Sequence, residues 1–195
     1  MSRSADIKRK TNETDIRLTL SLDGTGKGNI RTGIGFFDHM LTLFAGHGGF
    51  DLLLECDGDL HVDVHHSVED VGIVLGGAIK EALGGREGIR RYGYAVIPMD
   101  EALAEVALDL SNRPYLHFDV PFQSRQIGTM DTEMFEEFFR AVCVHGGITL
   151  HAILRHGKND HHRIEAVFKA FGRALKQAAS IDPDVKGVPS TKGVL

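Results

Sequence analysis

The sequence contains no tryptophan and three tyrosines, and cysteine and proline are also scarce, with two and five residues among 195. The lack of tryptophan and the scarcity of tyrosine disfavour a surface on which nucleic-acid bases stack. The formal net charge of −5, without a long basic run, gives no sign of a nucleic-acid or membrane partner. The longest apolar run, residues 71–79, is too short to span a bilayer.

The N-terminal segment and the cysteines bear on the cellular compartment. Residues 1–10 contain no apolar core of a signal peptide, so we expect no such peptide. Cys56 and Cys143 form no C-x-x-C motif. We interpret them as buried thiols in a reducing environment, and we expect a cytoplasmic protein.

Histidine, in contrast, is abundant, with 11 residues, and part of it belongs to a repeat. The pattern His-His-x-x-Glu occurs at residues 65–69 and again 96 residues later, at 161–165. The tripeptide His-Gly-Gly occurs at residues 47–49 and again 98 residues later, at 145–147. Two landmarks with nearly the same offset indicate an internal duplication.

The hydrophobic pattern predicts the same elements in each half. Strand-like runs, several with apolar and polar residues in alternation, lie at 15–23, 50–63, 104–111, 115–122 and 148–157. Amphipathic helical patterns without internal proline lie at 37–47, 67–83, 131–146 and 161–179. Asp131 or Thr132 is the predicted N-cap of the third helix.

These elements predict an α+β fold in which each half has a small mixed sheet and two helices. The halves would pack either helices against helices or sheet against sheet. No low-complexity linker divides the chain, so we expect one domain over 1–195. It would consist of repeats at about 1–95 and 96–182, followed by a glycine- and proline-rich tail at 183–195.

The spacing of the His-His-x-x-Glu units carries a prediction about metal ions. At the start of a helix, His65 and Glu69 lie on one face, whereas His66 lies about 100° around the axis. Adjacent histidines therefore serve two ions more easily than one. If the halves are related by a pseudo-twofold axis, one ion would take His65, Glu69 and His162, and the other would take His161, Glu165 and His66.

The donor chemistry limits the choice of metal. Imidazole and carboxylate without thiolate suit manganese, iron, nickel or zinc. His39 and, at the equivalent position of the second half, Glu137 are further candidate ligands. The alternative is that the two glutamates are ordinary solvated helix charges. Most of the remaining histidines would then be, as is common, core or surface residues: His47, His61, His117, His145, His151 and His156.

Several segments together resemble the imidazoleglycerol-phosphate dehydratase family, and the resemblance covers almost the whole chain. These segments are RKTNET (9–14), GFFDHML (35–41), DVHHSVED (63–70), PMDEAL (98–103), LDLSNRPYL (108–116), residues 157–175 and PSTKGVL (189–195). The resemblance implies a lyase of histidine biosynthesis that dehydrates D-erythro-imidazole glycerol phosphate to imidazole acetol phosphate. It also implies a duplicated α+β fold, two manganese ions per active site, and 24 subunits with active sites between them.

The resemblance also implies roles for individual residues. One ion would be held by His39, His66, His161 and Glu165, and the other by His65, Glu69, His162 and position 137. Position 137 is often His in the family and is Glu137 here, which can also ligate manganese. The direct ligand there, alternatively, is a water or His145. The implied catalytic residues are Glu165 as base at carbon, Glu13 as acid for the departing hydroxyl, His66 and Asp100.

The substrate phosphate requires cations and hydroxyl donors. By resemblance these are Arg91, Arg113, Lys169, Ser190 and Lys192, with the tail becoming ordered over the phosphate. Asp100 has an equally good interpretation as a turn or N-cap acid.

Two other functional classes compete with the dehydratase. A histidine-rich metal-binding protein without catalysis explains the His pairs but not the basic residues or Glu13. A dinuclear metallohydrolase explains two ions, but its ligands usually include more aspartates.

Overall fold

The computed structural model describes residues 3–195 of the chain. These residues form four helices, which are α1 (Gly35–Gly48), α2 (His65–Leu83), α3 (Met134–Gly146) and α4 (Asp160–Ala179). One sheet contains β1 (Ser4–Lys10), β2 (Thr14–Ser21), β3 (Gly28–Arg31) and β4 (Asp51–Gly58). A second sheet contains β5 (Tyr92–Met99), β6 (Ala102–Asp109), β7 (Tyr115–Asp119) and β10 (Thr149–His156). The short strands β8 (Gln126–Ile127) and β9 (Met130–Asp131) pair with each other.

The two sheets have the same topology. The strand order is β1-β2-β4-β3 in the first and β5-β6-β10-β7 in the second. In each sheet the first three strands pair antiparallel and the last one pairs parallel. Helix α1 therefore corresponds to α3, and α2 corresponds to α4. The predicted α+β fold with duplicated halves and mixed sheets is confirmed.

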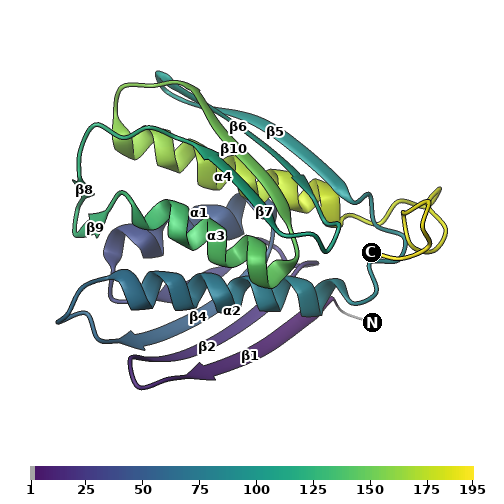
Figure 1. Cartoon of the computed structure of the whole chain (residues 1–195), viewed down its shortest axis with the longest axis horizontal. Coiled ribbons are helices and arrows are strands. Elements are labelled where there is room, and N and C mark those ends of the chain that lie inside the picture. Colours follow the sequence, from purple (N-terminus) through teal and green to yellow (C-terminus); the bar gives the residue numbers. More distant parts are fainter. Residues whose placement is uncertain (1–2) are drawn as a thin grey trace.

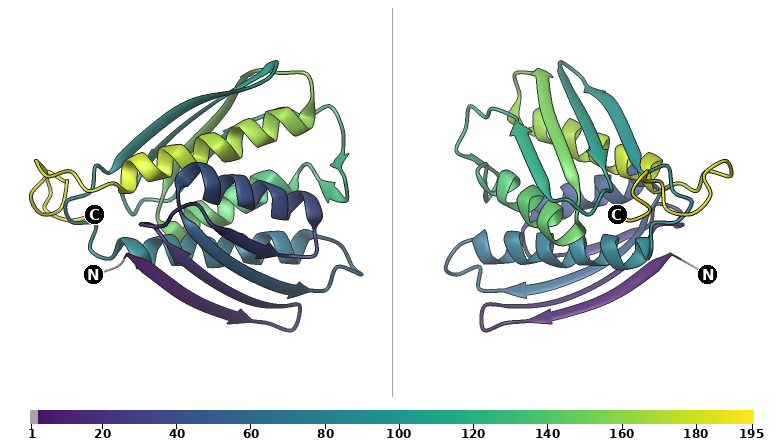
Figure 2. Two further views of the ribbon diagram at one scale, coloured as in Figure 1. Left: turned by 180° about the vertical axis from the view of Figure 1, so that it is seen from behind. Right: turned by 45° about the vertical axis from the view of Figure 1, so that its right-hand side comes forward.

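The helices lie between the two sheets (Figures 1 and 2). Helix α2 packs on β1 and β2, and α4 packs on β5 and β6. The halves meet helix against helix, because α2 contacts α3 and α4 contacts α1. All four helices begin at the same end of the molecule, and the C-terminal tail lies at the opposite end (Figures 1 and 2).

Equivalent glycines allow the helices of the two halves to approach closely. A Cβ atom on Gly76 of α2 would lie 2.7 Å from the carbonyl oxygen of Val142 in α3. A Cβ atom on Gly172 of α4 would lie 2.6 Å from the carbonyl oxygen of Phe44 in α1. Gly76 and Gly172 are 96 residues apart, like the two histidine pairs. The duplication thus extends to the closest helix contacts.

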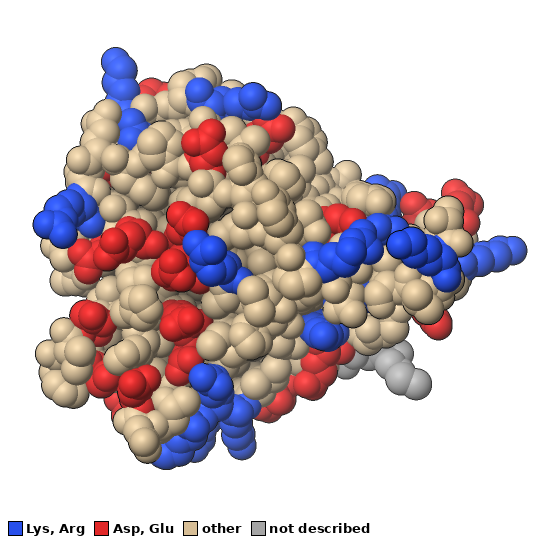
Figure 3. Space-filling view, in the orientation of Figure 1, with Lys and Arg blue, Asp and Glu red and all other residues tan. Residues whose placement is uncertain are grey.

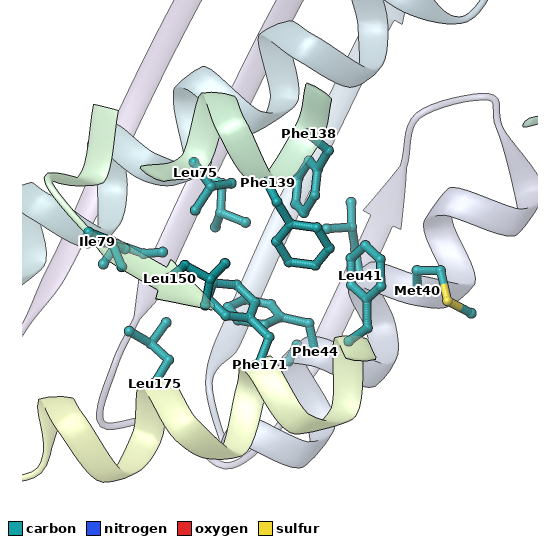
Figure 4. Close-up of a cluster of buried hydrophobic side chains, with 14 of the residues drawn as sticks. Met40, Leu41, Phe44, Leu75, Ile79, Phe138, Phe139, Leu150, Phe171 and Leu175 are labelled. Carbon is teal, nitrogen blue, oxygen red and sulfur yellow. The ribbon is translucent and has the colours of Figure 1, made fainter. Parts of the chain in front are cut away.

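Phenylalanine fills the core where the helices meet (Figure 4). The rings of Phe44 and Phe171 stack with centroids 5.1 Å apart, which joins α1 to α4. The rings of Phe138 and Phe139 in α3 both contact Phe168 of α4. Such aromatic pairs add to the burial of apolar area, so the helix ends that carry the polar residues rest on a rigid support.

The repeated His-Gly-Gly tripeptide ends a helix in each half. The C-cap of α1 is Gly49, with φ of 66°, and the C-cap of α3 is Gly147, with φ of 61°. Glycine adopts this left-handed conformation without the steric cost that other residues meet. The tripeptide is therefore a structural landmark of the repeat.

Some sequence predictions of the elements were wrong. Thr132 does not cap α3, because its hydroxyl donates to the carbonyls of Ser124 and Arg125, and Asp131 lies in β9. The predicted strand 50–63 ends at Gly58. The missed strands are β1, β3, β5, β8 and β9. Strand β1 is rich in charged residues, β3 has four residues, β5 contains glycine and proline, and β8 and β9 have two residues each. None of the helices in residues 3–195 has the length and hydropathy needed to cross a bilayer.

Candidate active site

The polar residues singled out from the sequence lie mainly where the four helices begin. This end of the molecule, at the left of Figure 3, exposes many acidic side chains. Helix N-termini carry partial positive charge, which favours carboxylates there. The candidate metal ligands are His39 in α1, His65, His66 and Glu69 in α2, Glu137 in α3, and His161, His162 and Glu165 in α4.

The two His-His-x-x-Glu helices start in the same way. The carboxylate of Asp63 accepts the backbone N–H of His65 at 2.8 Å. The side-chain oxygen of Asn159 accepts the backbone N–H of His161 at 2.9 Å. These local hydrogen bonds satisfy free backbone donors of the first turn. Each histidine pair is therefore fixed in its helical register from the start.

Three predicted ligands of one ion come together, His39 from the first half and His161 and Glu165 from the second. Among residues 3–195, His39, His161 and Glu165 form the one group of three or more possible metal ligands whose donor atoms all lie within 4.8 Å of one another. Oε2 of Glu165 lies 3.0 Å from Nε2 of His161 and 3.4 Å from Nε2 of His39. This group, which we name the Glu165 cluster, joins α1 to α4.

The surroundings of Glu165 keep it charged. Its side chain is only 8% exposed, and Oε1 lies 2.5 Å from the ammonium of Lys169, one turn further along α4. Burial alone would raise the pKa of Glu165, but Lys169, His161 and His39 outweigh burial and lower that pKa below its usual value. One carboxylate oxygen thus faces a lysine and the other faces two imidazoles.

The equivalent residues, His65 and Glu69 in the first half and Glu137 in the second, are spread out. Nε2 of His65 lies 3.7 Å from Oε2 of Glu69, and both side chains are half exposed. Glu137, the counterpart of His39, has its carboxylate 3.5 Å from Arg140 in its own helix. One chain therefore does not bring these three residues into a compact group like the Glu165 cluster.

His66 and His162 point toward the hairpin turns of their own sheets. Nδ1 of His66 lies 3.0 Å from Asp59, and its Nε2 lies 3.7 Å from Glu13 in the β1–β2 turn. The hydrogen bond to Asp59 raises the pKa of His66. The predicted acid Glu13 is thus next to a predicted ligand.

His162 has matching surroundings in the second half. Its Nδ1 lies 2.7 Å from Glu101, and its Nε2 lies 3.9 Å from Asp100. Glu101 raises the pKa of His162. The backbone N–H of Asn159, followed by His162, lowers the pKa of Glu101 to about 2. Asp100 lies in the β5–β6 turn with φ of 47°, so it caps no helix.

Neither predicted set of four ligands is complete within one chain. Within the described residues, His66 does not join the Glu165 cluster, because its ring is turned toward Asp59 and Glu13. His162 is likewise turned toward Glu101 and Asp100. Within one chain, each ring therefore lies apart from the other ligands of its predicted set.

The predicted phosphate ligands are also divided. Arg91 pairs with Asp109 at 2.7 Å and donates to the carbonyl of Pro189 in the tail at 2.8 Å. Arg113 lies 3.4 Å from the same Asp109. Ser190 and Lys192 follow in the tail, at the end of the molecule opposite the Glu165 cluster (Figure 1). Lys169, in contrast, contacts Glu165 of the Glu165 cluster.

Comparison with known proteins identifies the family. A family model described as imidazoleglycerol-phosphate dehydratase matches residues 32–175. A protein of that name from Acetivibrio thermocellus is 60% identical over 195 residues, which is 100% of each chain. One from Bacillus licheniformis is 56% identical, covering 99% of this chain and 100% of its own. The chain belongs to the imidazoleglycerol-phosphate dehydratase family.

Solved structures of this family have the same fold. The imidazoleglycerol-phosphate dehydratase from Staphylococcus aureus is 43% identical, with a TM-score of 0.83 over 92% of this chain and 99% of its own. The one from Pyrococcus furiosus is 39% identical, with a TM-score of 0.84 over 97% and 100%. The predicted family, fold class and enzyme class, a hydro-lyase of histidine biosynthesis, are confirmed.

The donor groups of this imidazoleglycerol-phosphate dehydratase family member fit manganese. The Glu165 cluster offers two imidazole nitrogens and a charged carboxylate oxygen, which suit ions of the manganese type. Burial raises the pKa of Cys56 to about 11 and that of Cys143 to about 12, and neither thiol belongs to the Glu165 cluster.

Sequence reasoning missed three carboxylates that hold site residues. Asp59 and Glu101 bind the rings of His66 and His162, and Asp109 binds Arg91 and Arg113. Glu101 is the neighbour of the predicted Asp100, and Asp109 lies in a segment that resembles the family. The folded chain was needed to show their partners, because none of the three has a regular spacing to the histidines.

Proposed function

We propose that the chain dehydrates D-erythro-imidazole glycerol phosphate to imidazole acetol phosphate, with two manganese ions per active site. The observation that carries the proposal is the Glu165 cluster, in which donor atoms from two helices face one point without a thiolate. The ligand sets are those predicted from the sequence. One set is His39, His66, His161 and Glu165, and the other is His65, Glu69, Glu137 and His162.

The chemistry requires an acidified carbon next to the imidazole ring. When bound, the two ions supply the Lewis acidity that lets the ring act as an imidazolate and so eases loss of the carbon-bound proton. Glu165 is the proposed acceptor of that proton, because its carboxylate is charged and buried. The hydroxyl on the next carbon leaves as water, and the resulting enol tautomerises to the ketone.

Glu13, His66 and Asp100 complete the proposed catalytic residues. Glu13 protonates the departing hydroxyl, and its position 3.7 Å from Nε2 of His66 keeps it beside a proposed ligand. Asp100 has the matching position beside His162 in the other half. The side chains of Glu13 and Asp100 are half exposed or more in one chain, so a second copy would have to cover them.

The active site is proposed to form between subunits of a homo-oligomer of 24 chains. Two observations support an arrangement of this kind. His66 and His162 are turned away from their ligand sets, and Arg91 contacts the tail whereas Lys169 contacts Glu165. A second copy can bring the divided groups together. The tail 183–195 would then close over the substrate phosphate with Arg91, Arg113, Lys169, Ser190 and Lys192.

A dehydration assay with controlled metal content tests the reaction. The protein is stripped with a chelator, and imidazole glycerol phosphate is added with and without manganese while the ketone is followed. We expect ketone only with manganese, and none in His65→Ala or His161→Ala. His151→Ala, at an exposed position of β10, serves as the control that keeps activity. Tight binding of two ions without any ketone would instead favour the metal-binding protein, and release of a hydrolysis product would favour the metallohydrolase.

Mixing two inactive variants tests the shared site. His66→Ala and His161→Ala are refolded or reassembled together, and the activity of the mixture is compared with that of each variant alone. If the two residues come from different subunits, some sites of the mixture contain both intact ligands, and activity returns in part. A mixture as inactive as its components would contradict the site between subunits.

A further inference from the structure

The rings of His66 and His162 are held by carboxylates in the same way. Nδ1 of His66 lies 3.2 and 3.0 Å from the two oxygens of Asp59, and Nδ1 of His162 lies 2.7 Å from Glu101. An ionised carboxylate only accepts hydrogen bonds, so each Nδ1 carries the proton. In the neutral ring, Nε2 is then left with a free lone pair.

The carboxylates themselves are anchored. Oε1 of Glu101 accepts the backbone N–H groups of Lys158 and Asn159 at 3.0 and 2.8 Å, while its Oε2 binds His162. Glu101 thus joins the β5–β6 turn to the residues just before α4. The backbone N–H of Asp59 donates to the carbonyl of Glu13 at 3.1 Å, which joins it to the β1–β2 turn. Both rings are therefore oriented by groups with limited freedom.

The two carboxylates come from different places in the repeat. Asp59 follows β4, and the equivalent residue after β10 is Gly157. Glu101 lies in the β5–β6 turn, and the equivalent β1–β2 turn contains Glu13, which faces Nε2 of His66 and not Nδ1. The two halves therefore reach the same hydrogen bond by different routes. Inheritance from one ancestral repeat does not explain two different carboxylates at Nδ1. A need to fix the orientation of both imidazole rings does explain them.

We propose that Asp59 and Glu101 are positioning residues that hold the Nδ1–H of His66 and His162, so that Nε2 of each ring binds a divalent cation. This inference rests on the proposed manganese-dependent function and adds to it two residues that do not themselves touch the ion. The other three histidines also direct Nε2 toward a carboxylate: His39, His65 and His161. All five rings would then ligate through the same nitrogen. Carboxylates that orient a ligating histidine in this way typically change metal affinity by about 10–100-fold.

Manganese binding by the intact, chelator-stripped protein tests the inference. The affinity for manganese alone is measured by calorimetric titration for the wild type, Asp59→Ala and Glu101→Ala. We expect each alanine variant to bind manganese about 10–100-fold more weakly. Asp59→Asn and Glu101→Gln keep an oxygen that accepts from Nδ1–H, so they should recover much of the affinity. Glu81→Ala, on the exposed face of α2, is the matched control and should bind like the wild type.

The outcomes separate this inference from the function on which it rests. A wild type that binds no manganese would overturn the proposed function itself. Wild-type affinity in both alanine variants would overturn the positioning role and leave the function standing. Equal weakening in the alanine and amide variants would also overturn it, because an accepting oxygen would then not matter. The two residues lie in different loops, so a folding defect in one variant leaves the other to decide.

Discussion

The two halves of the chain share a framework but differ in the exposure and contacts of their polar side chains. Both have the same sheet order and the same glycine contacts between helices. Yet Glu165 is 8% exposed and contacts two histidines and Lys169, whereas Glu69 is 47% exposed and lies 3.7 Å from His65. The equivalent of Lys169 in the first half is Ile73. Duplication has kept the packing and changed the charges.

The charges explain why one group is compact and the other open. The Glu165 cluster contains one carboxylate and two imidazoles, which attract one another. The equivalent group, from α2 and α3, has two carboxylates, Glu69 and Glu137, and one imidazole, His65. Two carboxylates without a cation repel each other, and Glu137 lies beside Arg140 instead. The difference therefore reflects charge in the absence of a cation, and both groups remain chemically fit to bind one.

The largest expected effect comes from the two equivalent glutamates. Glu165→Gln should lower kcat by about 10³-fold even at saturating manganese, because it removes the proposed proton acceptor. Glu69→Gln should mainly weaken manganese binding, so that excess metal restores most of the activity. The ketone assay at rising manganese concentration measures both. If Glu69→Gln stays as inactive as Glu165→Gln at saturation, the two halves do not differ in role.

The glycine contacts predict a loss of stability that is equal in the two halves. Gly76→Ala and Gly172→Ala each place a methyl group within 3 Å of a backbone oxygen in the facing helix. Overpacking of this kind typically costs about 1–3 kcal/mol. Chemical denaturation of the two variants checks the magnitude. Gly46→Ala, where an added Cβ meets nothing within 4 Å, is the control that should keep wild-type stability. A cost at only one glycine would show that the halves pack differently.

Periodicity and spacing predicted the framework better than the site. The four helices begin and end within three residues of their predicted ranges, because their apolar faces repeat regularly. The spacing of the histidine pairs likewise placed them at helix starts, as observed. Strand β1 was missed because charged residues occupy most of its exposed positions and only Ala5 and Ile7 are apolar. The ring orientations of His66 and His162 depend on Asp59 and Glu101, which have no periodic relation to them.

His39 and Glu137 are the one pair of equivalent candidate ligands that differ in residue type. Replacing Glu137 by histidine should make the two ligand groups more alike. Glu137→His places in α3 the residue type that His39 provides in α1. The variant removes one of two repelling carboxylates, so we expect the group of His65, Glu69 and position 137 to be compact without metal. Manganese affinity should change by no more than about tenfold, which corresponds to about 1.4 kcal/mol. Calorimetric titration measures this change, with Glu137→Ala as the comparison that loses a ligand. Equal weakening in both variants would argue that position 137 requires a carboxylate.

The smallest expected effect concerns the first residue of the strand that follows the first helix of each half, Asp51 in β4 and Thr149 in β10, and the loop that each of them holds. In the first half, Asp51 accepts the backbone N–H groups of Thr25 and Lys27 at 2.8 and 3.0 Å, and these hydrogen bonds lower the pKa of Asp51 below 3.8. In the second half, the equivalent Thr149 donates its hydroxyl to the carbonyl of Arg113 at 2.8 Å. A carboxyl with a lowered folded pKa stabilises the fold above its unfolded pKa, and this stabilisation is lost as the pH falls through the folded value.

Hydrogen exchange, corrected for intrinsic rates, should therefore lose protection at residues 25–27 between pH 5 and pH 3. Asp51→Asn should remove that pH dependence, whereas the contact of Thr149 contains no titrating group. An equal loss of protection at residues 113–115 would mean that acid loosens both halves through a common cause, and not through Asp51.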